Sequence, residues 1–322
     1  MHILALLNRD GGTLKTADLD ELSRFIRDEF QVQGHEVSVE IVAGGDIVGA
    51  IEAGAEREDI DVLLVGGGDG TVSAAAATLT DRDIALGILP AGTMNLFSRT
   101  LQIPLDLHAA VQALAAGEVT PVDVGSVNGQ PFIHQYATGL HARMVRLRER
   151  INYRSRFGKM WATTRAVSLA LRRLPKVELV INIDGRVERL TCSAIAVSNN
   201  LYGPGHLPFA DNPKGGALGV YICTERSLPR VTKLTLDILM GKWRENPDLI
   251  VKTAQRVELA YNGKTHANRA VRDGELDVLD ALSVVEIKPL ALKVLVPSEA
   301  TYLTDSPVLE TAEVGGREAY RG

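Results

Sequence analysis

Residues 66–71 combine four glycines with a carboxylate and a hydroxyl. They lie between an apolar run that predicts a buried strand, 61–65, and a pattern that predicts a helix, 72–79. Glycines at such a turn let backbone N–H groups approach a phosphate, and the helix N-terminus adds favourable dipole charge. A tight strand-to-helix turn capped by Asp69 is the structural alternative. The residues that we expect to bind phosphate are Gly67, Gly68, Asp69, Gly70 and Thr71.

A second polar loop, residues 89–95, follows the next predicted strand, 85–89. Successive loops of a parallel sheet meet at one edge, and open α/β sheets bind their ligands there. We therefore expect Gly92, Thr93 and Asn95 to lie beside the first loop. Taken alone, this segment is also typical of an ordinary turn followed by a helix N-cap.

The first third of the chain alternates apolar runs with helical patterns. The predicted strands are 3–7, 36–42, 61–65 and 85–89, and the predicted helices are 19–30, 47–55, 72–79, 94–100 and 107–116. Strands that are apolar throughout and separated by helices indicate a parallel sheet covered on both faces. We expect an α/β N-terminal domain with a doubly wound sheet.

After residue 121 strand-like segments predominate. They are 123–127, 131–137, 177–183, 187–197, 218–224, 256–260 and 282–287, with helical patterns at 141–174 and 228–240. Asn128-Gly129 and Asp184-Gly185 are hairpin signals between such runs. We expect a second, β-rich antiparallel domain of sandwich type with helical insertions, covering 123–297. The first domain would cover 1–122, and the chain would return to it through a last strand, 291–296, and residues 298–322.

Together the two polar loops resemble the catalytic domain shared by diacylglycerol kinases, sphingosine kinases and bacterial lipid kinases, within the NAD kinase superfamily. The matching residues are Gly67-Gly68-Asp69-Gly70-Thr71, Pro90-x-Gly-Thr-x-Asn95 and Arg99-Thr100-Leu101. Further landmarks follow in the family's order: Asn199-Asn200, Tyr202-Gly203-Pro204-Gly205, Asp273-Gly274-Glu275 and the closing run 292–297. The resemblance covers nearly the whole chain.

This resemblance implies ATP bound by the glycine loops and Mg²⁺ as the metal. Asp273 matches the position of the general base for a lipid hydroxyl in the cleft between the two domains, with Glu275 as its neighbour on the nucleotide or metal side. An alcohol that attacks a γ-phosphoryl group needs positioning, a metal to spread charge and a carboxylate to accept its proton. Read without the family, Asp273-Gly274 is a hairpin turn.

Two further residues receive roles from the resemblance. Asp123 matches a carboxylate that joins Asp69 in a metal and water network; read alone, it is a strand residue in polar surroundings. Lys15 matches a basic residue that reaches phosphates; a solvated lysine at the start of a helix is the alternative.

Three positions depart from the family's pattern. Leu96 stands where an Asp usually follows the Asn of the second loop, and His141 stands where the family often has an acidic residue. The segment 215–220 has no carboxylate where relatives carry Asp-Gly-x-Leu-Asp-Val, which argues against the structural Mg²⁺ site of some bacterial members. His141 would then line the substrate site or serve as a satisfied histidine at a helix start.

Composition and charge limit the other function classes. The chain has 322 residues and a formal net charge of −5, which argues against a general nucleic-acid binder. Cys192 and Cys223 are too few for a disulfide framework or an ordinary zinc site. No stretch approaches the length of a membrane span and no signal segment is evident, so we expect a cytoplasmic protein.

The segment 143–176 has the opposite charge balance, with eleven basic residues and one acidic residue. Apolar side chains are interleaved with the basic ones, as in segments that rest on an anionic bilayer. A solvated helix pair with a buried apolar stripe fits the pattern equally well. The first interpretation would place the protein at the inner face of the membrane.

The sequence thus favours an ATP-dependent, Mg²⁺-requiring lipid kinase that phosphorylates diacylglycerol or a related lipid. One alternative is a kinase of the same fold that acts on a sphingoid base or a soluble hydroxyl compound. Another is a catalytically silent nucleotide- or lipid-binding protein. The expected partners are a lipid substrate and a membrane surface, with a homodimer left open and no nucleic acid.

Overall fold

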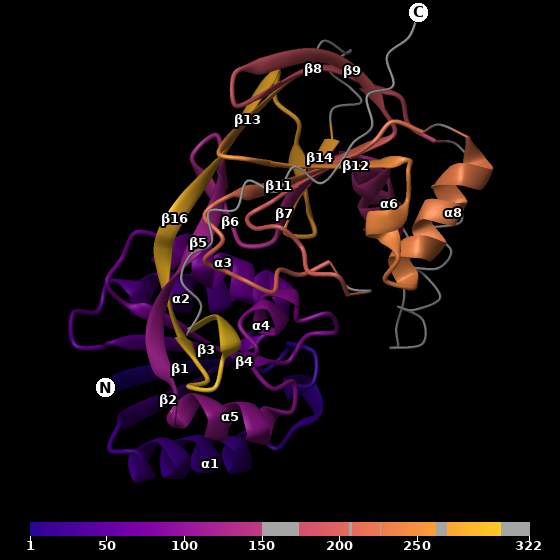
Figure 1. Cartoon of the computed structure of the whole chain (residues 1–322). Coiled ribbons are helices and arrows are strands. Elements are labelled where there is room, and N and C mark those ends of the chain that lie inside the picture. The colour runs from indigo at the N-terminus through magenta and orange to yellow at the C-terminus, as the bar shows by residue number, and fades with distance from the viewer. Residues whose placement is uncertain (150–173, 206–207, 226, 262–268, 304–322) are drawn as a thin grey trace, which may run out of the picture.

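The computed structural model describes residues 1–149, 174–205, 208–225, 227–261 and 269–303 (Figure 1). Most of the basic segment 143–176 therefore lies outside the described residues, as does the expected return of the chain beyond residue 303. Among the described residues, no helix has the length and apolar character that crossing a bilayer requires.

Four strands near the N-terminus pair in parallel in the order β2-β1-β3-β4. Their bounds are β1 (His2–Asn8), β2 (Glu36–Val42), β3 (Val62–Gly67) and β4 (Ala85–Pro90). Every residue of β3 and β4 is buried, because helices cover both faces of this part of the sheet. The helical segments are η1 (Leu14–Thr16), α1 (Leu19–Val32), α2 (Ile47–Ala55), α3 (Asp69–Leu79), α4 (Leu96–Thr100) and α5 (Leu107–Ala115).

The parallel strands continue into an antiparallel region through one long strand, β16 (Leu282–Val296). Val294 of β16 pairs in parallel with Leu86 of β4, while other residues of β16 pair antiparallel with β5 (Glu118–Val127) and β13 (Arg256–Tyr261). The sheet then ends with β8 (Val177–Ile183) and β9 (Arg186–Cys192), and β6 (Gln130–Phe132) pairs with β5. A single mixed sheet of ten strands therefore runs through both halves of the molecule.

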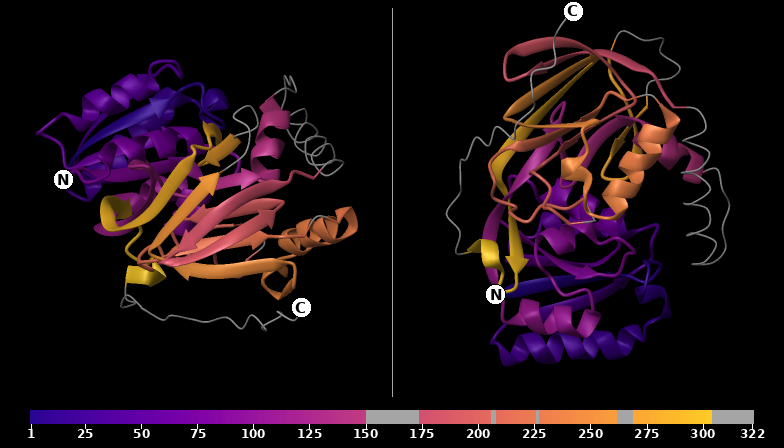
Figure 2. Two further views of the ribbon diagram at one scale, coloured as in Figure 1. Left: turned by 90° about the horizontal axis from the view of Figure 1, so that it is seen from above. Right: turned by 45° about the vertical axis from the view of Figure 1, so that its right-hand side comes forward.

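A second sheet of six antiparallel strands faces the distal part of the first, in the order β12-β11-β10-β7-β14-β15. The bounds are β7 (Gln135–Gly139), β10 (Ala194–Ser198), β11 (Leu218–Cys223), β12 (Leu249–Ala254), β14 (Arg269–Arg272) and β15 (Glu275–Val278). Buried side chains from both sheets, among them Phe132, Val220 and Val285, form one core between them. Two helices, α6 (Leu140–Glu149) and α8 (Leu228–Leu239), flank this half (Figure 2), and 3₁₀ turns η2 (Trp243–Glu245) and η3 (Thr301–Leu303) complete the fold.

The expected fold class is confirmed: a mixed α/β sheet is combined with a separate antiparallel sheet. The predicted strand 131–137 is wrong in detail, because it is two strands, β6 and β7, separated by Ile133 and His134. The predicted strand 187–197 is also two strands, β9 and β10, which belong to different sheets. Conversely, 282–287 and 291–296 are one strand with a register shift between Lys288 and Leu292. The strand β12 had no counterpart among the predicted elements.

The division into 1–122 with 298–322, and 123–297, remains a proposal. The strand β5 spans the boundary that we place at 122–123, and β16 ends just before the boundary at 297–298. These two strands pair along most of their length, so they form the connection between the two halves.

Candidate active site

Three loops meet at the carboxyl ends of β1, β3 and β4. In chain order they are a first loop after β1 (9–13), a second loop with the glycines (66–71) and a third loop (89–95). The amide of Thr13 donates a 2.9 Å hydrogen bond to the carbonyl of Ala91, which joins the first loop to the third. Gly12 has φ +39°, and a Cβ at this residue would lie 1.7 Å from the same carbonyl oxygen. Asn8 Nδ2 donates to Thr71 Oγ1 at 3.2 Å, which joins the first loop to the second. The expectation that the two polar loops share one sheet edge is thereby confirmed.

The second and third loops are packed so closely that only glycine fits at their contact. A Cβ at Gly92 would lie 2.8 Å from the Cα of Gly68 and 2.6 Å from Asn95 Oδ1. A Cβ at Gly67 would lie 2.6 Å from the Cβ of Thr71. The first-turn N–H groups of α3, which begins at Asp69, have no acceptor within the helix and face this edge. Such a cradle of N–H groups at a positive helix end suits a phosphate.

Asn95 and Asp69 hold the third loop against the second. Asn95 is buried in the left-handed conformation (φ 49°), with Oδ1 accepting from the Gly92 amide at 2.8 Å and Nδ2 donating to the Gly92 carbonyl at 3.2 Å. The carboxylate of Asp69 accepts from the amides of Asn95 at 3.1 Å and Leu96 at 2.8 Å. Asp69 uses two of the roughly four acceptor positions of a carboxylate, so it retains capacity for a metal or water.

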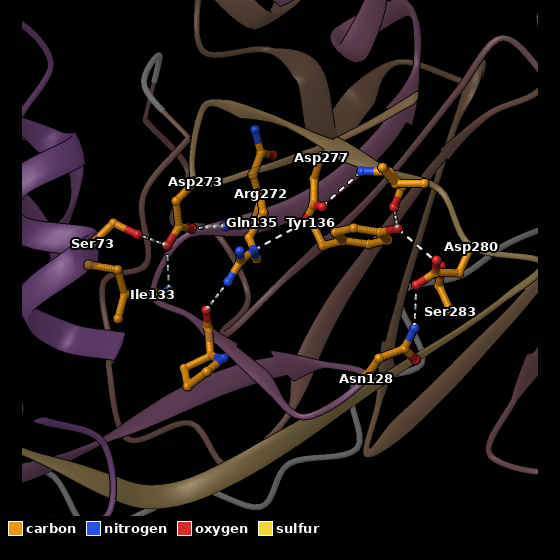
Figure 3. A network of polar contacts seen from close by, with 12 residues as sticks. Ser73, Asn128, Ile133, Gln135, Tyr136, Arg272, Asp273, Asp277, Asp280 and Ser283 are labelled. Carbon is orange, nitrogen blue, oxygen red and sulfur yellow. Dashed lines mark hydrogen bonds and ion pairs between the residues drawn. The ribbon is translucent and has the colours of Figure 1, made fainter. Parts of the chain in front are cut away.

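Asp273 occupies the turn between β14 and β15 and points toward α3 (Figure 3). Asp273 and Gly274 both have positive φ, 49° and 87°, as a tight hairpin turn requires. The Asp273 amide donates to the carbonyl of Gln135 at 2.9 Å, which fixes this turn against β7. The hairpin interpretation of this dipeptide is therefore confirmed, and the turn places its carboxylate beside the glycine loop.

Four donors surround the Asp273 carboxylate. Oδ2 accepts from the Ser73 hydroxyl at 2.7 Å and the Ile133 amide at 3.0 Å, and Oδ1 accepts from the amides of His134 at 2.9 Å and Gln135 at 3.1 Å. Burial raises the pKa of the Asp273 carboxyl above its usual value, while these four donors act in the opposite direction. The carboxylate thus has a full set of partners, of which only the Ser73 hydroxyl can rotate away.

Glu275 and His134 complete the surroundings of this turn. A Cβ at Gly70 would lie 3.1 Å from Glu275 Oε1, so the Glu275 carboxylate lies over the first turn of α3. Burial lowers the pKa of the His134 imidazole to about 4, and the negative charge of Asp69 opposes that shift. At neutral pH the ring is therefore neutral, and it stacks on Tyr202 with centroids 5.5 Å apart.

Asp123 occupies a different position, on β5 opposite the register shift of β16. It is buried, and its carboxylate accepts from the amides of Leu290 at 2.9 Å and Gly216 at 2.6 Å and from Asn200 Nδ2 at 2.8 Å. None of these hydrogen bonds joins Asp123 to Asp69. Among the described residues, no cluster of three or more His, Cys, Asp or Glu side chains has metal-binding geometry.

Other predicted residues lie around the same sheet edge without side-chain contacts that define a role. Lys15 is exposed in η1, which follows the loop after β1. Thr93 is exposed in the third loop. His141, one of the positions that depart from the family's pattern, contacts Gln135 Nε2 at 3.4 Å. The same Gln135 side chain accepts a 3.0 Å hydrogen bond from the Tyr202 hydroxyl through Oε1.

Sequence reasoning missed Ser73 and His134 as members of this site. Ser73 lies two residues after the glycine loop, on the first turns of α3, and that position is the one signal that could have identified it. His134 lay inside a run that the pattern predicted as continuous strand, so nothing local marked it.

Comparison with known proteins assigns the chain to one family. Residues 2–127 match the diacylglycerol kinase catalytic domain, and residues 135–296 match the YegS C-terminal NAD kinase beta sandwich-like domain. The chain therefore belongs to the diacylglycerol kinase and YegS-like lipid kinase family, and it is a kinase that transfers a phosphoryl group.

The relatives cover most of the chain. A diacylglycerol kinase of Bacillus subtilis is 27% identical over 255 residues, which are 77% of this chain and 82% of that protein. A diacylglycerol kinase of Staphylococcus aureus strain Newman is 25% identical over 247 residues, 72% of this chain and 78% of that protein. A crystal structure of a diacylglycerol kinase from Bacillus anthracis aligns with a TM-score of 0.68 at 19% identity, covering 93% of this chain and 98% of that one, and shows the shared fold.

Proposed function

We propose that this kinase transfers the γ-phosphoryl group of ATP to the hydroxyl of diacylglycerol or a closely related lipid, with Asp273 as the general base. The observation that carries the proposal is the position of the Asp273 carboxylate, hydrogen-bonded to Ser73 of α3. The glycine loop, 66–71, leads into this helix and ends in its first turn. A base beside a phosphate cradle is the arrangement that phosphoryl transfer to an alcohol requires.

The nucleotide side of the proposal rests on the two glycine loops. The N–H groups at the start of α3 would bind the phosphates of ATP, with Gly92, Thr93 and Asn95 bordering them and Lys15 supplying a positive charge. Asp69 fits Mg²⁺, because its carboxylate has acceptor positions left and Mg²⁺ in such sites takes one or two carboxylates together with substrate phosphates. Bound Mg²⁺ would spread the charge of the transferring group. Asp123 would join through water, and Glu275 would lie on the metal side.

The acceptor side of the proposal follows from the four partners of Asp273. The three amide donors belong to the backbone and keep the carboxylate in place. The lipid hydroxyl takes the position of the Ser73 hydroxyl on Oδ2 as that side chain rotates. Its oxygen then attacks the γ-phosphorus, its proton passes to Asp273, and the bond from the γ-phosphorus to the bridging oxygen breaks, which releases ADP.

The raised pKa of Asp273 is consistent with this role. A carboxylate in water is a weak base, and burial makes it a better proton acceptor by disfavouring its charge. The neutral ring of His134 adds no positive charge that would weaken this effect.

Phosphoryl transfer to a panel of alcohols tests the proposal. The full-length chain is incubated with γ-labelled ATP, Mg²⁺ and, separately, diacylglycerol, a sphingoid base and glycerol in mixed micelles. The proposal predicts a labelled diacylglycerol phosphate as the main product. A labelled sphingoid base or glycerol alone would assign another substrate to the same fold, whereas ATP binding without transfer to any acceptor would contradict the enzymatic proposal.

A further inference from the structure

The helix α8 presents an exposed apolar stripe on the outside of the antiparallel half. Leu228, Thr232, Leu236 and Met240 follow one another at four-residue spacing, so they lie on one side of the helix. Leu236 is 52% exposed and Met240 is 59% exposed. The opposite side carries Val231 and Leu234, which are buried against Cys223. The helix therefore has apolar side chains on both sides, and packing within the described chain accounts for only one of them.

Basic side chains border the stripe, and their acidic partners lie beneath them. The Lys233 side chain is 65% exposed and pairs at 3.0 Å with Asp237, which is 12% exposed. The Arg230 side chain is 57% exposed and pairs at 2.6 Å with both Glu225 and Asp248, which are 18% and 9% exposed. A molecule that approaches this face meets the cations first. Lys242, just beyond the helix, is exposed as well.

Aromatic contacts connect the end of α8 with the candidate active site. Trp243 in η2 makes an edge-to-face contact with Tyr221 at 5.7 Å, and Tyr221 stacks on Tyr202 at 4.8 Å. Tyr202 stacks in turn on His134, whose amide donates to Asp273. These contacts link η2, which follows α8 in the chain, to the candidate active site. Figure 2 places α8 in the β-rich half, away from α1.

We propose that this α8 face, defined by Leu228, Leu236, Met240, Arg230 and Lys233 together with Lys242, docks the kinase on an anionic lipid bilayer. The apolar side chains enter the interface while the cations contact lipid phosphates. The inference rests on the proposed function in one respect, since a substrate embedded in a bilayer makes such docking useful. A second copy of the chain is the alternative occupant, and the mass of the protein in solution tests it.

Vesicle binding tests the α8 face without reference to catalysis. The full-length chain is sedimented with phosphatidylcholine vesicles that contain or lack phosphatidylglycerol. We expect binding to the anionic vesicles and a loss of about tenfold in affinity when Leu236 and Met240 are both replaced by serine. The matched control is Val32→Ser, which alters an exposed apolar residue on α1 and should bind like the wild type. Equal binding of all three proteins would overturn the proposal.

A charge variant separates the two contributions. Lys242→Gln should weaken binding to anionic vesicles about fivefold and leave binding to phosphatidylcholine unchanged, because one cation near an anionic surface contributes on that scale. Light scattering measures the mass of each protein in solution. A dimer that dissociates in the Leu236→Ser, Met240→Ser protein would show that a second copy covers this face, which would also overturn the proposal.

Kinase assays keep this inference distinct from the proposed function. With a short-chain diacylglycerol below its micellar concentration, the Leu236→Ser, Met240→Ser protein should match the wild type, whereas with substrate in anionic vesicles its rate should fall about tenfold. Equal rates on vesicles would contradict docking while leaving the lipid kinase proposal intact. Absence of turnover with either form would contradict the proposed function instead, and vesicle sedimentation would still decide on docking.

Discussion

The hydroxyl of Ser73 donates a 2.7 Å hydrogen bond to the carboxylate of Asp273, and this bond joins α3 to the turn between β14 and β15. The two residues are 200 positions apart in the chain. Because Ser73 lies two residues after the glycine loop on the same helix, the bond fixes the distance between the phosphate cradle and the proposed base. The Ser73 hydroxyl also occupies the acceptor position on Asp273 Oδ2 that the lipid hydroxyl takes in the proposed reaction.

Ser73→Ala tests whether Ser73 is a replaceable partner. Substrate replaces its hydroxyl in the proposed reaction, so kcat should stay within about tenfold of the wild type. The free energy of unfolding should fall by about 1–2 kcal/mol, because a hydrogen bond to a buried carboxylate is lost. Steady-state kinetics and denaturant unfolding measure the two effects. A variant without detectable turnover would mean that Ser73 itself takes part in the transfer.

Gly92→Ala should damage the nucleotide site. The added Cβ would meet the Asn95 side chain and the Gly68 backbone, so the two loops must separate. We expect ATP affinity to fall by about tenfold or more and stability to fall by about 1–3 kcal/mol, as measured by calorimetry and thermal unfolding. In Gly49→Ala the Cβ has open space within α2, and this control should gain about 0.5–1 kcal/mol and bind ATP normally. Unchanged ATP affinity in Gly92→Ala would place the nucleotide elsewhere.

The pKa of His134 predicts a pH dependence of stability. The folded-state pKa of about 4 lies below the ordinary value of 6.5, so between these values the unfolded chain binds a proton that the folded chain does not. The free energy of unfolding should therefore fall as pH drops from 6.5 to 4, with about 2 kcal/mol from this residue. His134→Phe keeps a ring on Tyr202 and should show a shallower decline. Parallel declines for the two proteins would refute the assignment.

Asp123→Asn should destabilise the pairing of β5 with β16 at the register shift. The amide group would face one of the three donors that the carboxylate accepts from, and the free energy of unfolding should fall by about 2–3 kcal/mol. Asp81→Asn removes an exposed ion pair with Lys288 and should cost less than about 1 kcal/mol. Urea unfolding of both variants makes the comparison, and equal losses would show that Asp123 is not held as described.

Apolar periodicity and turn residues predicted those strands, helices and turns whose conformation depends on neighbouring residues in the sequence. The strand 36–42 and the helix 47–55 are found with the predicted bounds, because apolar periodicity fixes each of them. The Asp273-Gly274 and Asn128-Gly129 turns follow from residues that accept positive φ.

The remaining differences arise where distant contacts decide. The amides of Ile133 and His134 leave the strand ladder to bind Asp273, about 140 residues later in the sequence. At Ser193 the chain passes from one sheet to the other as its amide binds the Cys223 carbonyl. The glycine loops of the site could be predicted because their residues are adjacent in the sequence. The contribution of Ser73 could not, because it depends on where the distant strands β14 and β15 pack.

The kinetics of Asp273→Asn test the central claim most directly, with Asp277→Asn on the same hairpin as the control. The substitution removes the proposed base and leaves the glycine loops unchanged. Phosphoryl transfer from labelled ATP to diacylglycerol should fall by about a hundredfold or more, while the Kd for ATP changes little and Asp277→Asn retains turnover. Near-normal transfer by Asp273→Asn, in a protein that still folds and binds ATP, would contradict the assignment of Asp273 as the base.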